Sequence, residues 1–258
     1  MRFIVVNDVH ANSIALANFV ENLALIKFDK LIFLGDILTY GVNVQETINL
    51  LNEIKSKYSC VFIKGNHEQI YFDIQGNRRY QYKKFPDFLL ESISNTASKL
   101  NFNLEDEFDW VDSFRYKDVV FSHANLFRYG DWSYLNTEKD FDLNYSAMIE
   151  GGARGAIFGH THRAKYKSYK NNLEVSEVLT LPIRTKVCFD LNEKFLVTNG
   201  SLGQPRGSIS SFLICDIDSN NVSLQSVPIE YDIAMHCESI NQSSLTEETK
   251  EKLLKYYN

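Results

Sequence analysis

Eight residues that could bind metal ions or move protons each follow a short apolar run of the sequence. Such runs are typical of strands that are buried on both faces. Five of the six histidines belong to this group, and only His236 lies elsewhere. The members are Asp8, His10, Asp36, Asn66, His67, His123, His160 and His162. Carboxylates, imidazoles and an amide at successive strand ends indicate a metal-dependent active site.

The ligand types restrict the metal. Carboxylate, imidazole and amide groups without thiolate suit Mn, Fe, Zn, Co or Ni better than a soft-metal centre. Two ions in such a site lie roughly 3.5–4 Å apart and need a shared carboxylate. Asp36 is the predicted bridge, because it follows the second strand and the other candidates divide around it.

Each motif by itself also has a purely structural interpretation. Asp8 could be a turn residue, Asn66 could complete a tight turn, and His123 could be a core residue. His160 and His162 are more specific, because two imidazoles two residues apart can face one metal cluster. The recurrence of such residues at five strand ends favours the metal site.

The elements that must position these residues alternate between strand and helix in the first half of the chain. Apolar runs predict strands at residues 3–6, 31–34, 60–63, 119–122 and 156–158. Helical spacing follows Asn12 and covers residues 44–56, so we expect parallel strands joined by right-handed crossovers. The carboxyl ends of such strands form a ligand crevice. Residues 178–227 predict further strands and a helix is expected from Ser243, so the fold class is α/β with a β-rich second half.

Composition limits the class of protein. The 258 residues, 44% of them hydrophobic and 23% charged, suit one folded α/β domain. A net charge of -6 gives no reason to expect a general nucleic-acid or membrane binder. The first apolar run is too short for a signal peptide, and no run has membrane-spanning length. The four cysteines are isolated, as in a reducing compartment, so we expect a cytoplasmic protein.

The order of the motifs resembles that of the calcineurin-like metallophosphoesterase superfamily. Its signature stands here as Asp8-Val9-His10, Gly35-Asp36 with Gly41, Gly65-Asn66-His67-Glu68, His123 and Gly159-His160-Thr161-His162. Residues 199–206, with the sequence NGSLGQPR, are similar to a segment of the small bacterial and archaeal phosphodiesterase-like branch. The resemblance implies a four-layer αββα sandwich, in which two packed mixed sheets are flanked by helices, with helical insertions near the active site.

The resemblance also implies a role for each matching residue. One metal ion would be held by Asp8, His10, Asp36 and His162, and the second by Asp36, Asn66, His123 and His160. His67 would be the catalytic histidine, which stabilises or protonates the leaving group. Two divalent transition-metal ions, with manganese favoured, would polarise the phosphoryl oxygens and activate a water molecule.

Departures from the family pattern bear on the substrate. Ser/Thr protein phosphatases carry an Asp and an Arg where this chain has Thr39 and Tyr40, which disfavours a phosphoprotein substrate. Glu68 stands where small phosphodiesterases usually have Asp. Tyr40 and Arg206 are the candidate substrate contacts, and a structural ion pair is the alternative for Arg206.

We therefore expect a phosphoesterase that cleaves phosphodiester, phosphoanhydride or phosphomonoester bonds of a small molecule, with a nucleotide favoured. The alternatives are a protein-binding scaffold of the same fold and a nuclease. The complete metal set disfavours the scaffold, and the net charge and lack of a long basic stripe disfavour the nuclease. Residues 78–84 mix cations with tyrosines and could bind nucleic acid, although a solvated surface is the preferred interpretation.

Residues 1–258 are expected to form a single domain with two cap-like insertions, at about residues 71–117 and 125–151. Both would leave from the catalytic edge of the sheet, where long loops usually carry function. Their aromatic residues, Tyr80, Tyr82, Trp132 and Tyr134 among them, would suit a nucleobase. The alternative is that these rings form the core of a helical cap. The sequence leaves the natural substrate and the oligomeric state open.

Overall fold

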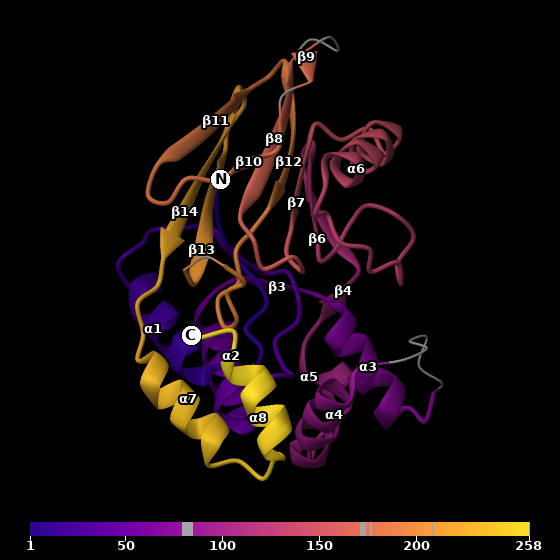
Figure 1. The fold of residues 1–258 in the computed structure, drawn as a ribbon. Coiled ribbons are helices and arrows are strands. Elements are labelled where there is room, and N and C mark those ends of the chain that lie inside the picture. Colours follow the sequence, from indigo (N-terminus) through magenta and orange to yellow (C-terminus); the bar gives the residue numbers. More distant parts are fainter. Residues whose placement is uncertain (79–84, 171–173, 176, 208, 258) are drawn as a thin grey trace.

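Two mixed β-sheets form the centre of the computed structural model, which describes residues 1–78, 85–170, 174–175, 177–207 and 209–257 (Figure 1). The first sheet has the strand order β11 (Lys186–Asp190), β14 (Asn221–Pro228), β13 (Ser211–Ile217), β1 (Arg2–Val6), β2 (Lys30–Phe33), β3 (Cys60–Ile63) and β4 (Trp110–Val111). The second sheet has the order β10 (Leu179–Thr180), β8 (Lys165–Lys170), β12 (Glu193–Thr198), β7 (Gly155–Phe158), β6 (Val119–Ser122) and β5 (Ser113–Tyr116), and β9 (Glu174–Val175) pairs with β8.

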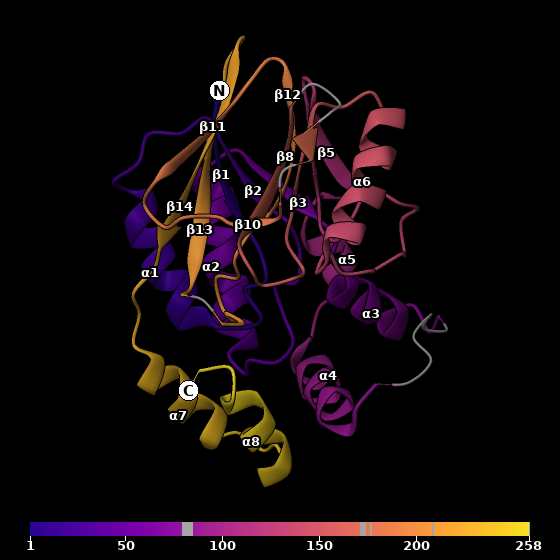
Figure 2. The same cartoon turned by 45° about the horizontal axis from the view of Figure 1, so that its top comes forward.

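Helices lie outside the two sheets, some against their outer faces and others beyond the ends of the strands (Figures 1 and 2). They are α1 (Ser13–Leu23), α2 (Val44–Lys57), α3 (Asn66–Gln75), α4 (Asp87–Lys99), α5 (Leu104–Glu107), α6 (Glu138–Glu150), α7 (Ile233–Asn241) and α8 (Glu247–Leu254). Helices α1 and α2 flank the first sheet, and α6 flanks the second (Figures 1 and 2). Among the described residues, no helix combines the length and the apolar character that a bilayer span requires.

Three hydrophobic clusters explain why these layers stack. Phe3 and Val5 of β1 belong to the cluster between the sheets, whereas Ile4 and Val6 belong to the cluster that contains the apolar faces of α1 and α2. A third cluster, which includes Phe141 of α6, lies on the outer face of the second sheet. Successive residues of a strand point to opposite faces, so a strand buried on both sides must be apolar throughout. The predicted fold class, two packed mixed sheets flanked by helices, is confirmed.

The strand directions bring the predicted site residues to one edge of the sandwich. Strands β1, β2 and β3 are parallel neighbours in the first sheet. In the second sheet, β6 and β7 are likewise parallel. The loops that follow these five strands therefore leave from carboxyl ends, where α/β sheets place their ligands.

Some elements have no clear signal in the sequence. Strand β8 has the sequence KYKSYK, in which Lys167 is fully buried and forms an ion pair with Asp142 of α6 (2.7 Å). Helix α7 was not expected from the pattern. The last helix begins at Glu247 instead of Ser243, because the Thr246 side chain caps its first turn.

Candidate metal centre

The eight residues predicted to form the site converge at the shared edge of the two sheets. The loops after β1, β2 and β3 supply Asp8, His10, Asp36, Asn66 and His67, and those after β6 and β7 supply His123, His160 and His162. All eight are buried, and the most exposed, Asn66, has only 8% of its surface accessible. Buried polar residues need partners, and here most of those partners are one another.

The backbone at these loops is strained. Five of the eight residues have φ between 50° and 63°, in the left-handed region that side chains with a Cβ rarely adopt: Asp8, His10, Asp36, His160 and His162. Each such residue costs of order 1–3 kcal/mol, and clusters of them are typical of functional sites.

The side chains divide into two groups that could each hold an ion. Within each group the candidate ligand atoms lie within 4.8 Å of one another. One group consists of Asp8, His10 and His162, and the other of Asp36, His123 and His160. This division agrees with the assignment that the family resemblance implies, although the role of each ligand remains a prediction.

Hydrogen bonds to the backbone fix which ring nitrogen of each histidine faces the centre. The Nδ1 atoms of His10, His123 and His162 donate to the carbonyl oxygens of Leu38 (3.0 Å), Leu34 (2.6 Å) and Gln204 (2.6 Å). His160 is turned the other way, and its Nε2 donates to the carbonyl of Trp132 (2.9 Å). A ring nitrogen that donates to a carbonyl carries the hydrogen, so the other nitrogen presents a lone pair.

Those lone pairs face one another. His10 Nε2 lies 3.2 Å from His162 Nε2, and His123 Nε2 lies 3.1 Å from His160 Nδ1 and 3.0 Å from Asn66 Oδ1. Acceptor atoms at such distances repel unless a proton or a metal ion lies between them, and the raised pKa of His123 shows the same demand for positive charge. The donor set therefore fits two metal ions in position as well as in chemistry.

The two carboxylates are arranged in the same way. Asp8 Oδ2 accepts hydrogen bonds from the side chain of Asn7 and from the backbone of His160, whereas its buried Oδ1 lies 3.4 Å from His162 Nε2 and accepts no hydrogen bond of good geometry from the described residues. Asp36 Oδ1 accepts from the backbone of His67 (2.9 Å), and Oδ2 lies 3.3 Å from His123 Nε2. One oxygen of each carboxylate is thus held by the fold, and the other is presented to the centre.

The electrostatics suit cation binding. Burial alone raises the pKa of Asp36, but positive charge at His123 and His67 lowers it well below its ordinary value. Burial lowers the pKa of His160 to about 3 and that of His10 well below its ordinary value, which leaves neutral rings able to bind metal. At His123 burial also lowers the pKa, but the charge of Asp36 outweighs it and raises the pKa to about 9. The space beside Asp36 and His123 therefore favours positive charge.

His67 differs from the other four histidines of the site. Its Nδ1 is buried without a hydrogen-bond partner, and its Nε2 lies 3.9 Å from Asp36 Oδ2. No backbone carbonyl of the described residues holds its ring, and it belongs to neither metal group. Burial lowers the pKa of His67. The described residues therefore do not fix the His67 ring by a hydrogen bond as they fix the other four rings, although His67 lines the cavity beside Asp36.

Residues outside the two metal groups support the loops of the site, and the sequence did not reveal their roles. Glu68 accepts hydrogen bonds from the backbone of Asp36, Ile37 and Gly65 (2.7–2.9 Å), and so ties two site loops together. The segment of residues 199–206 binds the first loop, because Gly203 N donates to the carbonyl of Asp8 (3.0 Å). A Cβ at position 203 would lie 1.8 Å from the carbonyl oxygen of Val9, so only glycine fits there.

A cavity of about 210 Å³ opens onto the centre. Its polar wall includes Asp36, His67 and Arg206, and its aromatic and apolar wall consists of Tyr40, Phe85, Leu89, Trp132 and Tyr134. Both predicted substrate contacts, Tyr40 and Arg206, therefore line the cavity. The Tyr40 ring packs edge-on against His10 and His67, with centroids 4.8 and 5.1 Å apart. Of the four aromatic residues expected to select the substrate, Trp132 and Tyr134 are in place, and Tyr80 and Tyr82 lie outside the described residues.

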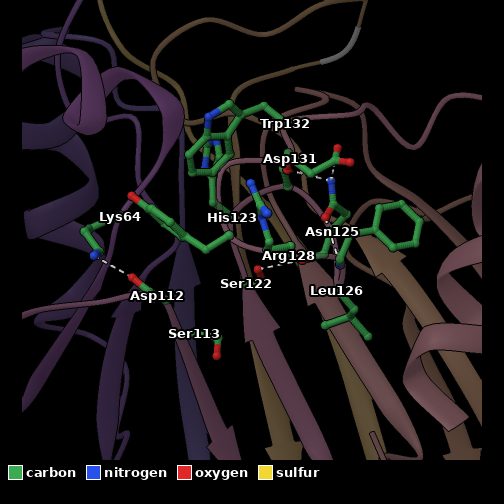
Figure 3. Close-up of a pocket in the computed structure, with 13 residues that line it drawn as sticks. Lys64, Asp112, Ser113, Ser122, His123, Asn125, Leu126, Arg128, Asp131 and Trp132 are labelled. Atoms are coloured by element: carbon green, nitrogen blue, oxygen red, sulfur yellow. Dashed lines mark hydrogen bonds and ion pairs between the residues drawn. The ribbon is translucent and has the colours of Figure 1, made fainter. Parts of the chain in front are cut away.

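A second cavity of about 130 Å³ adjoins His123 (Figure 3). Lys64, Arg128 and Trp132 line it, and Lys64 forms an ion pair with Asp112 (2.5 Å). Trp132 lines both cavities, so its side chain forms part of the wall between them. The ring of Trp132 also packs edge-on against that of His123, with centroids 5.8 Å apart.

Comparisons with known proteins agree with this geometry. A model of the calcineurin-like phosphoesterase family matches residues 1–164. An uncharacterized protein from Methanocaldococcus jannaschii is 28% identical over 253 residues, which cover 96% of each chain. A solved metallophosphoesterase from Sphaerobacter thermophilus has a TM-score of 0.74 at 21% identity and covers 99% of both chains. A hypothetical protein from Pyrococcus horikoshii has a TM-score of 0.73 at 15% identity, over 98% of this chain and 97% of that one, and both structures share the fold.

Two packed sheets that bring two buried His/Asp groups to their shared edge form a candidate dinuclear metal centre. The chain belongs to the calcineurin-like phosphoesterase family. The match confirms the predicted family. Enzymes of this family use two metal ions to hydrolyse phosphoester bonds, so the predicted hydrolase class is confirmed as well. The preference for manganese stays a prediction.

Proposed function

We propose that this protein hydrolyses phosphate esters or anhydrides of small nucleotides with two divalent metal ions, with manganese favoured. The observation that carries the metal-dependent part is the set of lone pairs that face one another across 3.0–3.2 Å. We assign Asp8, His10, Asp36 and His162 to the first ion, and Asp36, Asn66, His123 and His160 to the second, with Asp36 as the bridge. When bound, the ions supply positive charge at the phosphoryl oxygens and a water molecule of lowered pKa.

The remaining chemistry comes from side chains of the cavity wall. His67 is proposed to stabilise or protonate the leaving oxygen, since it lines the cavity and no backbone carbonyl of the described residues holds its ring. Its place in the first turn of α3 puts the positive end of a helix dipole at the same wall. Arg206 and Tyr40 are the proposed contacts to the substrate.

The aromatic wall supports the choice of a nucleotide. Phe85, Trp132 and Tyr134 come from the two segments proposed as caps on a single domain of residues 1–258, and base stacking on such rings is typically worth ~1–3 kcal/mol. Tyr134 also stacks on His160, with centroids 4.1 Å apart, so one face of its ring supports the metal group. Only its other face and edge can contact a base.

The alternative functions have less support. A protein-binding scaffold does not need buried lone pairs or an oriented pair of carboxylates, and the two groups of three His/Asp residues support the enzyme over the scaffold. A nuclease would need a basic surface, and residues 79–84, which contain most of the candidate stretch, lie outside the described residues. The four cysteines, Cys60, Cys188, Cys215 and Cys237, are free, which supports a place in the cytoplasm.

Metal analysis combined with Asp36→Asn tests the proposal. Wild-type protein prepared without chelator should carry up to two transition-metal equivalents and cleave nucleotide esters, whereas Asp36→Asn should lose metal and activity together. Asp216→Asn is the matched control, because Asp216 pairs with Arg2 at the opposite end of β1. A fully active Asp36→Asn variant with two bound ions would refute the assignment.

A further inference from the structure

Arg206 places an unneutralised positive charge in the wall of the candidate active site. Its guanidinium lines the same cavity as Asp36, His67 and His162. Among the described residues its buried Nε has no hydrogen-bond partner, whereas Nη2 donates a long hydrogen bond to Gln204 Oε1 (3.3 Å) and the side chain also hydrogen-bonds with that of Tyr134. In the part of the chain that the structure describes, no carboxylate forms a salt bridge with Arg206. The structural ion pair considered as the alternative is therefore absent from those residues.

Three tyrosines surround this cation. The guanidinium carbon lies 5.5 Å from the centroid of the Tyr256 ring, in a cation–π contact. Burial lowers the pKa of Arg206, but the phenols of Tyr40, Tyr134 and Tyr256 outweigh burial and raise it. Arginine is charged at any working pH, so Arg206 presents a cation in a half-buried position, where the Tyr134 side chain and the face of the Tyr256 ring are its neighbours.

A charge in such a position prefers an anion that enters with the substrate. A buried guanidinium without a carboxylate is costly, because its desolvation is not repaid by a fixed opposite charge. Arginine has five donors in a fork that matches two oxygens of a phosphate group. The Nε–H of Arg206 is one of these five donors, and among the described residues it has no acceptor.

We propose that Arg206 recognises an unesterified phosphoryl oxygen, which makes a terminal phosphate, and so a phosphomonoester or a terminal phosphoanhydride, the preferred substrate. The proposal rests on the proposed function, and it goes further by choosing between substrate classes. A monoester phosphate has three unesterified oxygens and about two negative charges, whereas a diester has two such oxygens and one charge. A fixed cation that is separate from both His/Asp groups therefore stabilises the monoester more.

The reaction that follows from this substrate is a balanced hydrolysis. One water molecule is consumed, its oxygen forms a bond to phosphorus, and the bond from phosphorus to the leaving oxygen breaks. A proton returns to the leaving oxygen, so the products are inorganic phosphate and an alcohol or a shorter phosphate.

Tyr256 is the positioning residue for Arg206, and it belongs to the C-terminal segment beyond the residues that match the family model. It follows α8, which lies beside α4 in both views of the fold (Figures 1 and 2). Glu91 of α4 accepts hydrogen bonds from the backbone and the side chain of Thr246, each at 2.7 Å. Because Leu89 of α4 lines the cavity, α4 and α8 form one support for the cavity wall and for Arg206.

The test compares two synthetic esters, p-nitrophenyl phosphate and bis(p-nitrophenyl) phosphate, in wild type and Arg206→Gln. We expect the variant to keep its metal content and to lose about 10- to 100-fold in kcat/KM on the monoester. On the diester the expected loss is under about 5-fold. Arg184→Gln is the matched control, since Arg184 is exposed and has only a long ion pair with Glu230 (3.9 Å).

A binding measurement gives a readout that does not depend on turnover. With manganese present, inorganic phosphate should raise the Tm of wild type more than dimethyl phosphate does, and Arg206→Gln should abolish that difference. Tyr256→Leu should raise KM for the monoester with kcat kept, and Tyr256→Phe, which keeps the ring, should restore it. Equal effects of the Leu and Phe variants would exclude a role for the Tyr256 ring.

The outcomes separate the two proposals. Equal losses on both esters, or a phosphate effect on Tm that Arg206→Gln leaves intact, would overturn the inference about Arg206 while the phosphoesterase stands. Wild-type protein that binds no metal and cleaves neither ester would overturn the proposed function itself.

Discussion

Glu68 offers the sharpest test of how the loops of the site are held. It is fully buried, and its two carboxylate oxygens accept three backbone hydrogen bonds, from Asp36 (2.7 Å), Gly65 (2.8 Å) and Ile37 (2.9 Å). Burial, and then the charge of Asp36, raises the pKa of Glu68 to about 7. The three hydrogen bonds stabilise the Glu68 carboxylate, and the nearby charge of Asp36 opposes them.

The substitution Glu68→Ala removes the acceptor of three buried donors. Each unsatisfied donor costs about 1–3 kcal/mol, which sums to about 3–9 kcal/mol, and the deleted side chain adds a small cavity term. Loss of the repulsion from Asp36 and entry of water offset part of this cost, so we expect a destabilisation of at least about 3 kcal/mol. Glu68→Gln keeps one oxygen but turns an amide donor toward a backbone donor, and should cost about 1–3 kcal/mol.

Urea unfolding followed by circular dichroism, with chelator present to remove any metal contribution, measures these differences. Glu91 is the matched control, because it also accepts three hydrogen bonds, from Thr246 and Thr249, but at a partly exposed position. Water can replace those bonds, so Glu91→Ala should cost less than about 1.5 kcal/mol. A Glu68→Ala protein destabilised by no more than Glu91→Ala would refute the reasoning.

Two further predictions concern single histidines. The His67→Ala variant should keep its metals and lose about 10²–10⁴-fold in rate on an ester with an alkoxide leaving group. On a p-nitrophenyl ester the loss should be far smaller, because that leaving group needs little protonation. Equal losses on both esters would exclude the role of His67 as an acid. His236 is fully buried beside the Tyr257 ring, and burial lowers its pKa to about 4. Since this folded pKa lies below the ordinary value of ~6.5, stability present above pH ~6.5 is lost as the pH falls toward 4, by about 3 kcal/mol in total. His236→Phe should flatten that part of the stability curve in urea unfolding at pH 7, 5 and 4, and parallel curves for the two proteins would contradict the prediction.

The sequence by itself was enough to predict the fold class and the group of candidate residues. Asp8 with His10, Asn66 with His67, and His160 with His162 are neighbours along the chain, and each pair follows an apolar run. Because parallel strands align their carboxyl ends, residues placed there gather at one edge of each sheet, and the packing of the two sheets then brings the two edges together.

The same local rules fail where contacts join distant segments. Strand β8 was missed because Lys167 is buried against Asp142, a partner that no pattern within β8 reveals. The role of Glu68 was likewise hidden, since its partners Asp36 and Ile37 lie about thirty residues earlier in the chain.

Only the tertiary structure decided which atoms of the site face a ligand. The carbonyls of Leu34, Leu38, Trp132 and Gln204 set the ring nitrogens of four histidines, and they come from three loops that are far apart in the sequence. The lack of a salt bridge between Arg206 and a carboxylate among the described residues, and the contact with Tyr256 some fifty positions later, are also products of packing. Sequence patterns report how a segment buries its own side chains, whereas the orientation of a buried polar group depends on partners that the fold brings from elsewhere.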